Sequence, residues 1–133
     1  MKSSPANASA PDSGAWILVV DDDSTMLGLV ALLLRGQGWQ VEAVGSADAA
    51  RAAIERAPNP PRVLVCDVIM DGVDGLQLTR ELRTRVPDLR VIVVSAHLND
   101  VAYWPEDLND CRFLSKPFAH DELISAVKAA LAG

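Results

Sequence analysis

The sequence predicts a single α/β domain built on a doubly wound, five-stranded parallel sheet. Two observations carry this prediction: short, continuously apolar runs alternate with segments of helical periodicity, and several runs end directly on a polar or charged residue. Such runs are typical of strands buried on both faces of a parallel sheet. Helices are therefore expected on both faces, and 133 residues suit one domain with its own core.

The first half of the chain supplies three of the five strands. Residues 1–14 are dominated by small and polar residues, proline and glycine, so we expect a disordered tail before a domain over 15–133. The predicted elements are a strand over 16–20, a helix from an N-cap at Ser24 to a stop at Gly36 or Gly38, a strand over 39–44, a helix over 47–57 capped by Ser46, and a strand over 62–67.

The second half continues the alternation. The predicted elements are a helix over 74–85 that Pro87 ends, a strand over 90–96, a strand over 111–114 and a helix over 120–131. Between the last two strands, the segment 97–110 is expected to form only one or two short turns, because Pro105 would break the interior of a helix.

Charge and composition exclude several classes of partner. The chain has 18 Asp and Glu residues against 12 Lys and Arg residues, a net charge of −6. Such a chain repels nucleic acids and anionic membranes, so neither is expected as a partner. No apolar run approaches 18 residues and the N-terminus has no signal-peptide pattern, so we expect a cytoplasmic protein. Cys66 and Cys111 are expected to be free thiols.

Polar residues stand where four predicted strands end, and in a parallel sheet these ends meet at one rim. They are Asp21, Asp22 and Asp23 after the first strand, Asp67 at the third, Ser95 at the fourth and Lys116 at the fifth. Carboxylates this close repel one another, and a bound Mg²⁺, which prefers oxygen ligands, would neutralise that repulsion. An ammonium and a hydroxyl opposite a metal suit a phosphoryl group. Asp67 is then the candidate nucleophile that forms an aspartyl phosphate.

Four stretches at these strand ends, VVDDDSTM, CDVIMDGVDG, VVSA and SKPF, together resemble the receiver domain of two-component response regulators. The resemblance covers residues 16–131. It implies the strand order 2-1-3-4-5 of flavodoxin-like sheets. It also implies a phosphoacceptor signalling protein that is not an enzyme in the usual sense, because it catalyses only its own phosphorylation and slow dephosphorylation.

The resemblance assigns the phosphoacceptor and the metal ligands. It implies that Asp67 accepts a phosphoryl group from a histidine kinase or a histidine phosphotransfer protein. It also implies that Asp21, Asp22, Asp67 and the backbone carbonyl of Ile69 hold Mg²⁺.

The same resemblance assigns the residues around the phosphoryl group. Ser95 and Lys116 would stabilise it, and Ser95 and Phe113 would switch a surface that binds a downstream protein, whose identity the sequence does not give. A cis peptide bond before Pro117 is also implied.

Some residues depart from the family pattern. Asp71 stands where the family usually has proline and adds an acid near the site. Ile69 is apolar and cannot orient an attacking water, whereas His97 can, so we expect slow self-dephosphorylation with Ile69, Asp71 and His97 as modulators. Residues 108–110 replace the usual Gly-Ala turn, and the fourth helix of the family is expected to be short or irregular.

Alternative functions share parts of this pattern. Since little sequence follows the last helix, we expect a stand-alone receiver that acts through protein contacts; a module of a hybrid sensor kinase or a phosphate sink would use the same residues. The intact set disfavours an unphosphorylated scaffold. Residues 21–25 also fit the D-x-D-x-T pattern and resemble haloacid-dehalogenase phosphatases, with Asp21 as nucleophile and Asp23 as acid/base. That family needs a further acidic pair after its lysine, which this sequence lacks.

Overall fold

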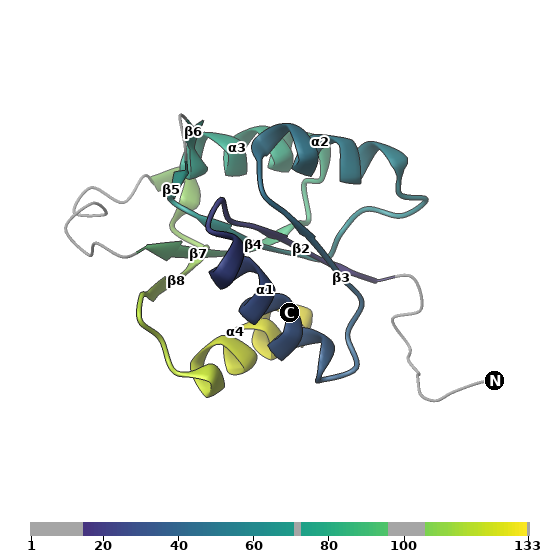
Figure 1. Cartoon of the computed structure of the whole chain (residues 1–133). Helices are drawn as coiled ribbons and strands as arrows, with labels where there is room; N and C mark the ends of the chain where they lie inside the picture. The colour runs from purple at the N-terminus through teal and green to yellow at the C-terminus, as the bar shows by residue number, and fades with distance from the viewer. Residues whose placement is uncertain (1–14, 71–72, 96–105, 133) are drawn as a thin grey trace.

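A computed structural model of the chain describes residues 15–70, 73–95 and 106–132. In this part of the chain, five parallel strands form one sheet and α-helices cover both of its faces (Figure 1). The strands of the sheet are β2 (Ile17–Val20), β3 (Val41–Val44), β4 (Val63–Asp67), β7 (Arg90–Ser95) and β8 (Arg112–Ser115). The helices are α1 (Ser24–Arg35), α2 (Ala47–Arg56), α3 (Gly75–Arg85) and α4 (His120–Ala132).

The strand order confirms the predicted fold class. Across the sheet the strands lie in the order β3-β2-β4-β7-β8, which is 2-1-3-4-5 in chain order. Every neighbouring pair is parallel. The order reverses between β2 and β4, and the crevice outside the carboxyl ends of the strands at such a switch point is where sheets of this kind bind ligands.

Two apolar layers, one on each face of the sheet, form the core. Leu18 and Val20 of β2 belong to the layer beneath α2 and α3. Ile17 and Val19 belong to the layer beneath α1 and α4. All four side chains are 1% exposed or less. Because consecutive residues of a strand point to opposite faces, burial on both faces explains why this strand is an unbroken apolar run.

The helix starts follow local hydrogen bonding, with one correction to the sequence analysis. Ser46 caps α2 as predicted, accepting a hydrogen bond from the Ala49 N–H. For α1, however, the N-cap is Asp23 rather than Ser24, and its carboxylate accepts from the N–H groups of Thr25 and Met26. Aspartate is as good an N-cap as serine, and its charge also favours the positive end of the helix dipole.

A short antiparallel pair, β5 (Ile69–Met70) with β6 (Val73–Asp74), joins β4 to α3 and was not predicted. After it the chain returns close to the end of β4, where the Gly75 N–H donates to the Val68 carbonyl at 2.6 Å. A Cβ atom at Gly75 would lie 1.8 Å from the carbonyl oxygen of Asp67. The start of α3 therefore sits against the end of β4 at a distance that only glycine permits.

Several predictions fall outside the described residues. These are the tail over 1–14, Asp71, His97 and most of the segment 97–110. The last part of that segment forms a single 3₁₀ turn, η2 (Glu106–Leu108), in line with the short turns expected there. Within the described ranges, no helix has both the length and the apolar character that a membrane span needs.

Candidate functional site

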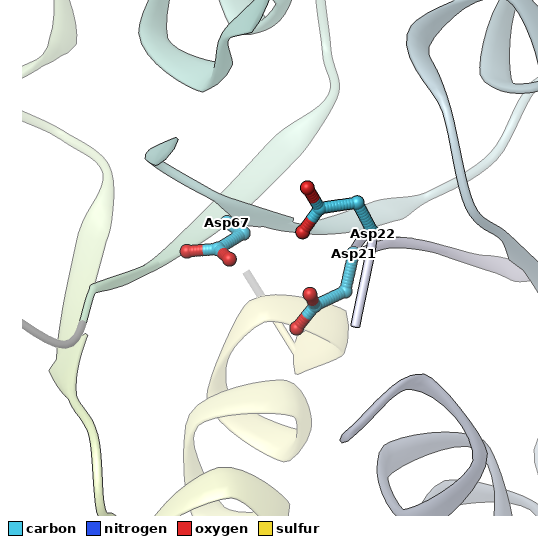
Figure 2. A group of neighbouring side chains, drawn as sticks. All are labelled: Asp21, Asp22 and Asp67. Atoms are coloured by element: carbon cyan, nitrogen blue, oxygen red, sulfur yellow. The ribbon is translucent and has the colours of Figure 1, made fainter. Parts of the chain in front are cut away.

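Three carboxylates gather at the carboxyl ends of β2 and β4. These strands are neighbours with Val20 beside Cys66, so Asp21 and Asp67, the next residues, come side by side. One carboxylate oxygen from each of Asp21, Asp22 and Asp67 lies within 4.8 Å of the other two. Figure 2 shows the three side chains close together at the strand ends, with Asp21 and Asp22 pointing toward the side on which Asp67 lies. We call these three residues the acid cluster.

The backbone and the adjacent turn fix Asp21 within this cluster. Its N–H donates to the Val44 carbonyl of β3 at 3.2 Å, and its Oδ1 accepts from the Asp23 N–H at 2.9 Å. The side chain of Asp21 is 7% exposed, whereas Asp22 is exposed to solvent. The cluster therefore has a buried, fixed member and an exposed one that solvent can reach.

Lys116 brings a positive charge to the acid cluster from the far side of β7. Its N–H donates to the Ser95 carbonyl at 2.7 Å, which ties the residue after β8 to the end of β7. Its Nζ donates to Oδ2 of Asp21 at 3.2 Å and to Oδ2 of Asp67 at 3.3 Å. The following bond, Lys116–Pro117, is cis, as the sequence analysis expected.

The electrostatics of the site are unbalanced, with three carboxylates against one ammonium. Burial raises the pKa of Asp67, and Asp21 and Asp22 raise it further, although Lys116 opposes them. Burial lowers the pKa of Lys116, but Asp21 and Asp67 outweigh this effect and the pKa is raised overall. Carboxylate oxygens are the ligands that Mg²⁺ prefers, so this excess of negative charge and this donor set fit a divalent cation.

The comparison with known families decides the identity of this site. A family model described as the response regulator receiver domain matches residues 17–128. The chain belongs to this receiver family. Receiver domains are the phosphoacceptor signalling modules of two-component systems, and the strand order and the acid cluster described above agree with that membership.

The relatives of this receiver include curated regulators and solved structures. NtrC from Salmonella typhimurium is 34% identical over 116 residues, which cover 86% of this chain and 24% of that protein. TcrX from Mycobacterium tuberculosis, a probable transcriptional regulatory protein, is 31% identical over 118 residues, which cover 86% of this chain and 49% of that protein. The chain thus spans 24% to 55% of the length of NtrC, TcrX and two further curated relatives.

Two solved structures are similar along most of the chain. The receiver domain of NtrX from Brucella abortus is 37% identical, with a TM-score of 0.77, over 87% of this chain and 98% of that one. The response regulator TrrA from Thermotoga maritima, solved in complex with Mg²⁺–BeF, is 23% identical, with a TM-score of 0.75, over 87% of this chain and 98% of that one. Because the sequence identity to TrrA is only 23%, this similarity supports a shared fold and nothing further.

Of the other predicted site residues, the structure describes Ser95, Phe113 and Ile69. Ser95 ends β7, and its side chain is buried at 1% exposure. Phe113 lies in β8 beside Val93 and is partly buried. Ile69 begins β5, and its side chain is 57% exposed. The structure therefore brings Ser95 to the rim, between the strands that lead to Asp67 and Lys116.

One residue important to the site was missed by the sequence analysis. Gly75 allows the start of α3 to rest against the Asp67 backbone, and so helps to hold the acid cluster in place. The sequence did contain a signal for the role of Gly75. Asp74 is the N-cap of α3, and a glycine at the first helical position is unexpected because glycine is a poor helix former. Asp23, which the phosphatase alternative requires as an acid/base, is instead hydrogen bonded as the cap of α1.

Substitution of Asp67 tests the charge imbalance in the metal-free receiver. The folded state raises the pKa of Asp67 above its ordinary value of 3.8, so it binds that proton more tightly than the unfolded chain does. Stability is therefore lost as the pH rises through the folded-state pKa. At pH 7 Asp67→Asn should raise the melting temperature, with the difference shrinking as the pH falls toward 3.8. Thermal unfolding checks this expectation, with Asp88→Asn, a change at an exposed acid in the turn after α3, as the control that should leave the melting temperature unchanged. A lower melting temperature for Asp67→Asn at pH 7 would contradict it.

Proposed function

We propose that this receiver accepts a phosphoryl group on Asp67 in a Mg²⁺-dependent reaction, taking it from the phosphohistidine of a histidine kinase or a histidine phosphotransfer protein. The observation that carries the proposal is the ammonium of Lys116, held at 3.2 and 3.3 Å from Asp21 and Asp67 beside a third carboxylate. An ion pair that served only stability would need neither the third carboxylate, Asp22, nor a position where the strand order reverses.

The transfer is a substitution at phosphorus. A carboxylate oxygen of Asp67 forms a bond to phosphorus, the bond from phosphorus to the donor imidazole nitrogen breaks, and the imidazole leaves with that electron pair. Asp21, Asp22, Asp67 and the carbonyl of Ile69 would hold Mg²⁺, which supplies positive charge beside the phosphoryl oxygens. Lys116 would pair with another phosphoryl oxygen and the Ser95 hydroxyl would donate to a third.

The output would be a change in a protein-binding surface. Ser95 and Phe113 lie on neighbouring strands, with Ser95 beside Ser115 and Phe113 beside Val93. We propose that Ser95 moves toward the phosphoryl group and that Phe113 follows, which alters the surface that a downstream protein contacts. Hydrolysis is slow in this proposal, because the exposed side chain of Ile69 has no polar atom to orient water. Asp71 and His97 would modulate it further.

Phosphorylation by acetyl phosphate tests the proposal without the cognate kinase. With Mg²⁺, intact-mass spectrometry should detect one added phosphoryl group that is lost in base, as expected of an acyl phosphate. Asp67→Asn should show no adduct, while Asp48→Asn, which alters an exposed carboxylate 96% accessible to solvent, should match the wild type. Removal of Mg²⁺ with a chelator should abolish the adduct. An equal adduct in Asp67→Asn, or none in the wild type with Mg²⁺, would refute the proposal.

A further inference from the structure

A second charged site lies at the rim opposite the acid cluster, where β4 and β7 begin. A cavity of about 690 Å³ opens there between the turn before β4 and the turn that joins α3 to β7. We call it the basic cavity. Its charged lining residues are Arg62, Arg83, Arg85, Arg90, Asp88 and Asp110.

The lining of the basic cavity is positively charged, whereas the whole chain is negatively charged. The lining contains four guanidinium groups and two carboxylates, a balance of two positive charges, although Arg85 is paired at 3.2 Å with Glu55 outside the lining. The whole chain carries −6. Four of the chain's 12 cationic residues are thus gathered around one cavity. Guanidinium groups present forked donors that match carboxylates and phosphates. The lining therefore favours an anion.

Arg83 carries the most specific evidence for a ligand. Its Nη1 and Nη2 donate to the two carboxylate oxygens of Asp110 at 2.9 and 2.7 Å, and Nη2 also donates to the Leu89 carbonyl at 3.3 Å. Its Nε is buried and has no hydrogen-bond acceptor among the described residues. A buried donor left without an acceptor costs about 1–3 kcal/mol. Asp110 shows that a carboxylate fits the forked Nη1 and Nη2 donors of this guanidinium, and an anion in the cavity could share these donors with Asp110.

The walls of the basic cavity are held in place without a ligand. Pro60, Pro61 and Pro87 line it and restrict the backbone on both sides. Arg62 is anchored twice, because its N–H donates to the Trp16 carbonyl at 2.9 Å and its Nη2 donates to the Leu131 carbonyl at 3.1 Å. The volume falls within the range of about 300–1,000 Å³ that is usual for small-molecule sites, most of which are largely formed before binding.

We propose that the basic cavity binds a small organic polyanion, with at least two carboxylate or phosphate groups, that contacts the guanidinium groups of Arg83 and Arg90. Asp110 competes with this ligand for Arg83. The cavity lies at the opposite end of the strands from the acid cluster, so the proposal is independent of phosphorylation at Asp67.

Titration of the metal-free receiver with citrate and, separately, with pyrophosphate at constant ionic strength tests the proposal, and the two arms distinguish carboxylate from phosphate ligands. At least one anion should saturably shift the Arg83 Nε–Hε resonance. Arg83→Gln and Arg90→Gln should each weaken binding about tenfold, as expected for the loss of a charge-assisted contact. Asp110→Asn should strengthen it severalfold. Arg56→Gln removes another exposed, ion-paired arginine outside the cavity and should leave the affinity unchanged.

Three results would overturn the proposal. The first is a shift that does not saturate with either anion. The second is an equal shift of the Arg56 and Arg83 resonances, which would indicate general screening by ions. The third is an affinity that survives Arg90→Gln, a change at an exposed position that keeps the fold even if Arg83→Gln does not.

Discussion

Replacing Gly75 with alanine is expected to destabilise the receiver by about 3 kcal/mol or more. The added Cβ would lie 1.8 Å from the carbonyl oxygen and 2.8 Å from the carbonyl carbon of Asp67, and 3.0 Å from the Cα of Val68. All three are backbone atoms, so no side-chain rotation can relieve the overlap. Either α3 moves away from β4 or Asp67 moves away from the acid cluster, and Mg²⁺-dependent phosphorylation should fall with stability in both cases.

Gly28 provides a matched control on another helix. A Cβ atom there would meet nothing within 4 Å among the described atoms. Because Gly28 lies inside α1, Gly28→Ala should stabilise the receiver by about 0.5–1 kcal/mol. Urea unfolding of the two variants measures both effects. If Gly75→Ala is as stable as the wild type, α3 does not approach the end of β4 as closely as described above.

Replacing Lys116 with methionine is expected to cost at least about 100-fold in the rate of phosphorylation, a typical loss for one group that stabilises transition-state charge. In the metal-free protein the same change should destabilise the fold by about 2–4 kcal/mol, because it leaves carboxylates facing one another without their cation. Lys116 donates to both Asp21 and Asp67, and its side chain is 16% exposed, so water compensates little. Lys128→Met, on the exposed side of α4, is the control for the same chemical change.

A double variant separates charge repulsion from lost packing. Adding Asp67→Asn to Lys116→Met removes one of the facing carboxylates and should recover part of the lost stability, with a coupling of about 1 kcal/mol or more. Mg²⁺ should likewise stabilise Lys116→Met more than it stabilises the wild type. Strictly additive effects in chelator would show that Lys116 contributes through packing and not through its charge.

The fold was predictable because its central strands are buried on both faces. Unbroken apolar runs identified the three central strands β2, β4 and β7, whereas β3 and β8, at the sheet edges, contain Glu42 and Arg112 and were recognised by their place between helices. The convergence of parallel strand ends predicted that Asp21, Asp67 and Lys116 meet at one rim. The N-cap of α1 was placed one residue late, since Asp23 and Ser24 are chemically almost equal as caps.

Other features depend on contacts that local sequence does not encode. The two-residue strands β5 and β6 are too short to show any periodicity. Arg80 and Arg83 of α3 form ion pairs with Asp107 and Asp110, residues 27 positions away, so only the tertiary fold reveals them. The basic cavity was missed for the same reason, because its arginines come from the turn before β4, the last turn of α3 and the start of β7.

The packing of β2 has a consequence for the order in which the chain can fold during synthesis. Ile17 and Val19 of β2 belong to the same core layer as Leu123 and Val127 of α4. A nascent chain that has not yet released α4 from the ribosome therefore lacks part of this layer, although α1 can already pack against β2. It also holds Asp21 and Asp67 without Lys116 for as long as β8 is missing. Completion of the core and neutralisation of the acid cluster thus both await the final quarter of the chain, so folding of this domain is expected to be a late, single event in translation.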